Sequence, residues 1–334
     1  MFDRILTDFI APVFYPLLPQ HRFFWLYLLS ALIIALIACY VRQPSDGKRS
    51  FRRAILDVFP RRVFMHPSAL LDYRFVFINH AVNVVLFGVL VISTVTSTEI
   101  CLALLQFSLS EDPVRVAPGA LASLGFTICL LLAVDGGLFL AHWLQHKVPL
   151  LWEFHKVHHA AEVLTPITDM RMHPVDTLVS TFVQTSLIGT VNAVFLYLYS
   201  DPVTEVTVIG ANAIAFTLYL AGYHLKHSHV WILYPRGIRE HISSPALHLI
   251  HHSTNPKHFD KNFARFFTFW DRLAGTLYIP DCREELEFGL GEKDQRELST
   301  VWQLYVTPFR NVLTRLRRRV TRSRRAYRGA ESAP

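Results

Sequence analysis

Five long apolar runs separate the charged parts of the chain, and they cover residues 23–41, 75–95, 117–141, 177–200 and 203–223. The first run is uncharged and has nearly the ~20 residues with which a helix crosses a bilayer. The third carries one charge, Asp135, and an ionisable group inside a span is typically paired or functional. Asp201 and Pro202 form a turn between the last two runs, whose polar residues fit either a spanning or a re-entrant hairpin. The pattern predicts an all-α integral membrane protein with four to five spans or hairpins.

Basic residues are concentrated in two blocks, the connection 42–74 and a C-terminal stretch with eight arginines between residues 315 and 328. The net charge is +7, although only 18% of the residues are charged, against about 25% in soluble domains. Lys and Arg favour the cytoplasmic side of a span, so we expect both blocks there, together with residues 142–176 and 224–334. Beside spans such blocks favour contact with anionic lipid at the basic tail, and we expect no nucleic-acid partner.

Fourteen of the seventeen histidines lie between residues 142 and 258, in groups with helical spacing. HWLQH has two histidines four residues apart, and HKVHH and HLIHH each have an i, i+3, i+4 set, which lies on one face of a helix. Imidazole suits iron, zinc and copper, and the four cysteines show no paired spacing. As packing residues, so many buried imidazoles would each need a hydrogen-bond partner. The spacing therefore favours two metal ions in a histidine-rich cytoplasmic cap, bound by His142, His146, His155, His158, His159, His248, His251 and His252.

These groups, with RMHPVD, KHSHV and WDRLAGTL, resemble in order and spacing the fatty acid hydroxylase/sterol desaturase superfamily, over about residues 135–280. The resemblance implies that the eight histidines are iron ligands, that His227 is a further ligand and that His224 is an additional one. It implies that His173 is a ligand or a supporting residue. Asp271 resembles an orienting partner for a ligand imidazole, and an ion pair with Arg272 or another Arg is the alternative.

Several positions depart from the pattern typical of the superfamily. His229 follows the His-Ser pair where Asn is common, Asn262-Phe263-Ala264 replaces Asn-Tyr-Gly, and Ala274 replaces Phe. None of them is a predicted ligand, so we expect these departures to change the shape of the substrate channel and not the ligand set.

The resemblance implies a membrane di-iron enzyme that uses O2 to hydroxylate an unactivated C–H bond of a membrane lipid. The substrate would be an acyl chain, a sterol, an alkylglycerol or an aminolipid such as an ornithine lipid, and desaturation with the same site is the alternative. Electrons would come from a cytochrome or ferredoxin-type protein or from a reduced pterin, because the chain has no haem or dinucleotide motif of its own. The compact size is similar to bacterial members, which favours the bacterial inner membrane over the endoplasmic reticulum.

The predicted organisation has an N-terminal membrane region (1–116), a catalytic domain (117–280) and a basic cytoplasmic tail (281–334). Two other classes of protein also carry many histidines. A metal transporter would place its ligands within the spans, with carboxylates along the path, and these runs are nearly free of carboxylates. A membrane zinc hydrolase would need a general-base carboxylate beside its ligands, as in H-E-x-x-H, which is absent from this sequence.

Overall fold

The computed structural model describes residues 9–44, 47–90, 93–111, 113 and 115–331. Over this part the regular secondary structure is helical apart from one two-stranded hairpin and isolated bridges, and loops connect the helices. Three helices are long and apolar enough to cross a membrane, at Pro67–Leu86, Ala120–Lys147 and Pro174–Leu198. The protein is therefore a multi-pass integral membrane protein, and the predicted helical membrane fold class is confirmed.

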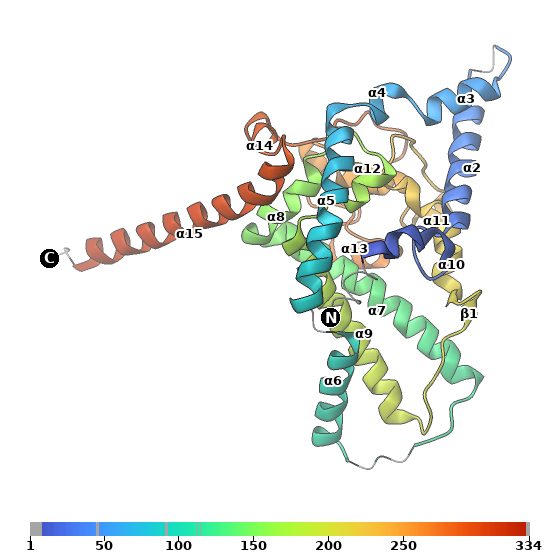
Figure 1. The fold of residues 1–334 in the computed structure, drawn as a ribbon, viewed down its shortest axis with the longest axis vertical. Helices are drawn as coiled ribbons and strands as arrows, with labels where there is room; N and C mark the ends of the chain where they lie inside the picture. The colour runs from blue at the N-terminus through green and yellow to red at the C-terminus, as the bar shows by residue number, and fades with distance from the viewer. Residues whose placement is uncertain (1–8, 45–46, 91–92, 112, 114, 332–334) are drawn as a thin grey trace.

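The elements follow one another along the chain in the order shown in Figure 1. The longer helices are α2 (Trp25–Val41), α3 (Phe51–Val58), α5 (Pro67–Leu90), α6 (Thr94–Ser108), α7 (Ala120–Lys147), α8 (Pro149–His159), α9 (Pro174–Leu198), α10 (Ala213–Leu220) and α15 (Val301–Glu331). The short ones are α4 (Arg61–Phe64), α11 (Arg236–Arg239), α12 (Pro245–His251), α13 (Phe269–Ala274) and α14 (Glu292–Arg296), and the strands are β1 (Thr207–Val208) and β2 (Ala211–Asn212).

The last apolar run, 203–223, does not form a spanning helix. It folds into the antiparallel β1–β2 hairpin and the eight-residue helix α10, which is only about 12 Å long. Ile209 and Gly210 have positive φ between the strands, the backbone conformation that tight two-residue hairpin turns require. Of the two alternatives for this run, the structure has a short hairpin and helix instead of a transmembrane helix.

Helices α6, α7 and α9 pack side by side in the lower half of the molecule (Figure 1). A Cβ atom on Gly189 of α9 would lie 2.4 Å from Oγ of Ser97 on α6, so glycine is what lets these two backbones approach. A Cβ on Gly136 of α7 would lie 2.9 Å from the ring of Trp270. Close packing at these glycines holds α9 against α6 and α7 against α13, and α7 and α13 flank the histidines.

Two buried carboxylates join the helices to the loops around the histidines. Asp72 of α5 forms an ion pair with Arg171, Oδ1 to Nη1 2.7 Å, and both side chains are fully buried. The Nε of Arg171 also donates to the carbonyl of Val157 in α8, at 2.8 Å. Asp135 of α7 accepts from the backbone amides of Phe266 and Phe267 at 2.8 and 3.0 Å. Asp135 thus anchors the loop before α13 to α7 and bonds no histidine.

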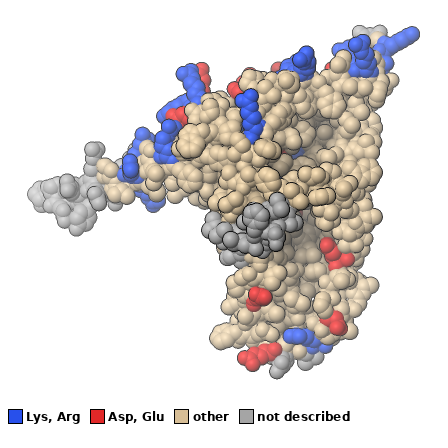
Figure 2. Space-filling view, viewed as in Figure 1, with Lys and Arg blue, Asp and Glu red and all other residues tan. Residues whose placement is uncertain are grey.

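Charge is distributed unevenly over the surface. Figure 2 shows Lys and Arg along α15 and at the end of the molecule that carries α3 and α4, while the lower body is mostly uncharged. Helix α15 extends away from the body, crosswise to the packed α7 and α9 (Figure 1). The basic residues and the apolar helices therefore occupy different parts of the molecule.

Candidate metal centre

Nine buried or half-buried histidines form two groups, in each of which one nitrogen atom per residue lies within 4.8 Å of the others. The first group is His142, His146, His155, His159 and His251, and the second is His158, His227, His248 and His252. Each group draws on three parts of the chain: α7, α8 and α12 for the first, and α8, α12 and the segment after α10 for the second. The fold therefore brings together residues up to about a hundred positions apart in the sequence.

The two HxxHH helices divide their histidines between the groups in a reciprocal way. Helix α8 gives its i and i+4 residues, His155 and His159, to the first group and its i+3 residue, His158, to the second. The HLIHH segment does the opposite, because His251, its i+3 residue, joins the first group. On a helix, positions i and i+4 lie about 40° apart, whereas i+3 lies on the other side of i. Each motif thus faces two points at once, and the two adjacent histidine groups share both motifs.

The nitrogen atoms of the second group surround a common point. Nε2 of His227 lies 3.1 Å from Nε2 of His158, 3.2 Å from that of His252 and 2.9 Å from that of His248. Imidazole nitrogens bound to one metal ion at about 2.0–2.1 Å are expected to lie roughly 3 Å apart. In the first group, Nε2 of His146 and His159 are likewise 3.1 Å apart. The spacing of these donor atoms fits a bound metal ion.

Three histidines of the first group each have one nitrogen in a hydrogen bond and the other free. Nδ1 of His142 bonds the carbonyl of Phe263 at 3.0 Å, and Nδ1 of His251 bonds that of Lys261 at 2.8 Å. Nδ1 of His155 bonds Oδ2 of Asp176 at 3.0 Å. Among the described residues, Nε2 of all three is buried without a hydrogen-bond partner. A proton held on Nδ1 leaves the Nε2 lone pair available, which is the arrangement that metal-bound histidines use.

Burial keeps the imidazoles outside the spans in the neutral form that binds metal. Desolvation, followed by the neighbouring histidines, holds the pKa of His158, His159, His248 and His252 well below the usual value. Burial also lowers the pKa of His251 to about 3. These groups therefore carry no proton that a metal ion would have to displace at neutral pH.

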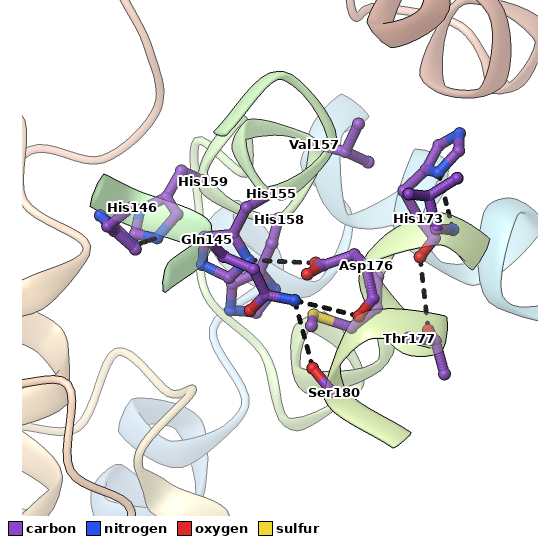
Figure 3. A network of polar contacts seen from close by, with 12 residues as sticks. Gln145, His146, His155, Val157, His158, His159, His173, Asp176, Thr177 and Ser180 are labelled. Carbon is purple, nitrogen blue, oxygen red and sulfur yellow. Dashed lines mark hydrogen bonds and ion pairs between the residues drawn. The ribbon is translucent and has the colours of Figure 1, made fainter. Parts of the chain in front are cut away.

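Two carboxylates that the sequence reasoning missed lie beside the groups. Asp176 bonds His155, and its backbone carbonyl accepts a hydrogen bond from Nε2 of Gln145 at 3.0 Å (Figure 3). Oδ1 of Asp169 lies 3.5 Å from Nδ1 of His227. The only local signal for Asp176 is its position three residues after His173 in RMHPVD. For Asp169 there is none, because its partner is 58 residues away.

The structure places His173 and His224 outside both groups. Nδ1 of His173 accepts from the amide of Val175 and so caps α9, and its Nε2 lies 3.2 Å from the carbonyl of Tyr305. Figure 3 shows His173 apart from the clustered rings, with Asp176 between. Nε2 of His224 bonds the carbonyl of Arg22 at 2.6 Å. Both side chains therefore support the backbone around the centre.

Asp271 supports His142 indirectly, through the backbone. Its carboxylate accepts hydrogen bonds from the amides of Phe263 and Ala264 at 2.8 and 2.9 Å and from the Thr276 hydroxyl at 2.7 Å. The carbonyl of Phe263 is the one that His142 bonds. Asp271 thus holds the segment that orients His142, with no direct contact to an imidazole. Arg272, its alternative partner, donates to the carbonyl of Glu240 instead.

Two cavities reach the histidines from different sides. One of about 260 Å³ is lined by His142, His155, His158, His227 and His248, by polar residues of α9, and by charged side chains described below. The other, of about 720 Å³, is lined by His146, His159, His251 and His252 and has Asp260, Glu287 and Glu292 in its wall. The first cavity adjoins the membrane helices α7 and α9, and the second has a charged rim.

The chain matches known proteins over about half of its length. The model of the fatty acid hydroxylase family matches residues 127–276. Ornithine lipid hydroxylase OlsE of Rhizobium tropici is 27% identical over 164 residues, which cover 49% of this chain and 45% of that protein. Human cholesterol 25-hydroxylase is 30% identical over 162 residues, covering 48% and 54% of the two chains. Alkylglycerol monooxygenase of Xenopus tropicalis is 26% identical over 167 residues, covering 48% and 31%.

The aligned part spans about half of these curated relatives or less. No solved structure matches the chain.

Proposed function

Residues 127–276 belong to the fatty acid hydroxylase family, and on this premise we propose that the protein is a membrane-bound, O2-dependent lipid hydroxylase with two iron ions. The observation that carries the proposal is the pair of closely spaced histidine groups, in the first of which three buried Nε2 atoms have no partner among the described residues. Such all-imidazole sites suit iron, and imidazole withstands oxidants that would consume thiolates.

The first group would hold one iron ion and the second group the other. When bound, the two ions would activate O2 toward an unactivated C–H bond. The chain orients the ligands through Asp176 and through the carbonyls of Phe263 and Lys261. The cavity beside α7 and α9 would hold the reacting part of the lipid away from bulk water.

The membrane lipid would enter from the side of α7 and α9, whose apolar spans end at the centre. An acyl lipid, a sterol, an alkylglycerol and an aminolipid such as an ornithine lipid are all compatible with the family. Because hydroxylation and desaturation need the same ligands, desaturation is the alternative outcome. Electrons would come from a separate cytochrome or ferredoxin-type protein or a reduced pterin.

We infer the sidedness of the protein from its basic residues. The Lys and Arg of the 42–62 segment and of α15 favour the cytoplasmic face for the histidine centre, in a bacterial inner membrane. Helix α15 also has an exposed apolar stripe at three- and four-residue spacing, with exposed arginines around it. The stripe is formed by Trp302, Val306, Phe309, Leu313, Leu316 and Val320. These features support α15 lying on an anionic membrane surface.

The test compares the wild-type protein with the double variant His158→Ala/His159→Ala, which removes one histidine from each group. Purified wild type should contain about two irons per chain, and the variant should lose them. The exposed His241 provides the control His241→Ala, which should keep its iron. Lipid mass spectrometry of expressing cells should then reveal products with one added oxygen, or with two hydrogens fewer for the desaturase alternative.

If the purified wild-type protein contains only zinc, it must be reconstituted with iron before the comparison with the variants is repeated. Wild-type protein that binds no metal after reconstitution would overturn the proposal, and so would iron retained at wild-type level in the double variant.

A further inference from the structure

The cavity beside α7 and α9 contains a cluster of charged side chains, in addition to its histidines. Arg22, Lys226 and Arg265 line it together with one carboxylate, Asp169. A cavity meant only for an acyl chain or a sterol ring would be lined by apolar groups, because a buried charge is costly without a partner. The charged residues therefore call for a polar occupant.

Three of these four charged groups have partners within the protein. Nη1 of Arg22 forms an ion pair with Oδ2 of Asp169 at 2.5 Å. The other oxygen of Asp169 faces His227. Nζ of Lys226 donates to the hydroxyl of Ser243 at 2.8 Å, and burial lowers the pKa of Lys226 to about 7. The carboxylate and two of the three cationic side chains are thus already engaged.

Arg265 differs from the others. Its guanidinium lies 4.5 Å from the ring centroid of Tyr223 and 5.8 Å from that of Phe266. Within the described part of the chain, Arg265 has no hydrogen bond and no ion pair, and its Nε is buried without a partner. Aromatic rings hold the guanidinium in place but leave its planar set of N–H donors unused. That donor set matches a phosphate or a carboxylate.

We infer that Arg265 binds an anionic group, phosphate or carboxylate, at the polar end of the lipid substrate. The inference rests on the proposed function and makes it more specific, because the same cavity is lined by His158, His227 and His248. Its volume of about 260 Å³ is below the roughly 300–1,000 Å³ of pockets that enclose a whole ligand. Only part of a lipid fits, and the charges select the head-group end. The oxidised C–H bond therefore lies near the head group, and the acyl chains remain along α7 and α9.

The experiment measures binding, so that it does not depend on turnover. Iron-reconstituted protein in neutral detergent is titrated by calorimetry with dihexanoyl phosphatidate, dihexanoyl phosphatidylcholine and inorganic phosphate. We expect wild type to prefer phosphatidate over phosphatidylcholine by on the order of tenfold, the effect of one charge-assisted hydrogen-bonded pair. Arg265→Gln should reduce this preference to about one, and Arg265→Lys should keep part of it. The exposed Arg236 gives the matched control, because Arg236→Gln removes the same charge elsewhere.

Iron content and helical circular dichroism are recorded for each variant, so a general loss of structure is separated from a loss of the anion site. If Arg265→Gln fails to fold, the inference is judged on two other results. These are the wild-type preference for phosphatidate and whether Arg265→Lys keeps part of that preference. Equal affinity of wild type for the two lipids overturns the inference, as does an unchanged preference in Arg265→Gln. Phosphate binding as tightly as phosphatidate also overturns it, because the lipid would then contribute nothing. A protein that binds phosphatidate through Arg265 but forms no oxidised lipid would refute the proposed function alone.

Discussion

Asp176 holds His155 through a buried hydrogen bond of 3.0 Å between Oδ2 and Nδ1. The bond fixes the ring so that its Nε2 points at the first histidine group. Because Asp176 lies in the first turn of α9 and His155 lies on α8, the same contact couples a membrane helix to the histidine groups. The orientation of this ligand thus depends on the packing of the spans.

We expect Asp176→Asn to weaken metal binding by about 10–100-fold, because the amide replaces the carboxylate as acceptor for the Nδ1 proton. Competition titration of the apoprotein with Fe²⁺ and a chelator of known affinity measures this loss. Asp201→Asn, at an exposed turn, is the control and should leave affinity unchanged. Wild-type affinity in Asp176→Asn would show that Asp176 does not support a ligand.

Removing one partner of the Asp72–Arg171 pair should destabilise the protein severely. We expect Arg171→Met to lower the free energy of unfolding by about 3–5 kcal/mol, because it leaves the Asp72 carboxylate buried without its counter-charge. Unfolding in mixed micelles measures this change. The double variant Asp72→Leu/Arg171→Met should lose less than the sum of the single variants, whereas strict additivity would mean that the two residues are not coupled.

Gly189 is expected to tolerate no side chain. Gly189→Ala places a Cβ against Ser97 and should lower the free energy of unfolding by about 1–3 kcal/mol, because α6 and α9 must separate. Gly119→Ala is the matched control, since nothing lies within 4 Å of its added Cβ. The two variants are compared by thermal unfolding in detergent. Equal stability would mean that the two helices can shift apart without cost.

The stripe on α15 should contact the bilayer. In a Cys282→Ser background, an environment-sensitive fluorophore at Leu313→Cys should show apolar emission in nanodiscs and be quenched by brominated lipid. The same probe at Arg318→Cys, about 140° around the helix, should report water. The difference should be larger in phosphatidylglycerol than in phosphatidylcholine, because arginines surround the stripe. Identical spectra at both positions would contradict a membrane-bound α15.

Helical spacing was enough to predict that the motif histidines lie together, because i, i+3 and i+4 share a face whatever the tertiary fold. It could not divide them between two sites. His158 and His159 are adjacent in sequence but belong to different groups, and this division depends on where α7 and α12 pack. Asp169 and Asp176 were missed for a related reason, since a lone carboxylate acquires its role only from a partner far along the chain.

The membrane helices were predicted where apolar residues continue for twenty positions or more. Two predicted spans are exceptions. The run 23–41 forms α2, whose 17 residues fall short of a spanning helix. The run 203–223 is also apolar but contains Ile209 and Gly210, whose positive φ values turn the chain into a hairpin. Composition alone does not reveal such a turn when the residue before the glycine is isoleucine. Asp135, which the sequence marked only as a paired or functional group, bonds the Phe266–Phe267 backbone and so fastens the loop beside the centre.

The two cavities at the histidines have no lining histidine in common. A lipid seated against α7 and α9 therefore does not fill the acidic-rimmed cavity. Under the proposed function, a small reductant and the lipid would not compete for one entrance. Double-reciprocal plots of the steady-state rate against lipid concentration, at several reductant concentrations, should therefore intersect. Neither compound should inhibit binding of the other competitively. The histidine centre would thus have two separate entrances, and the lipid and the reductant could bind in either order.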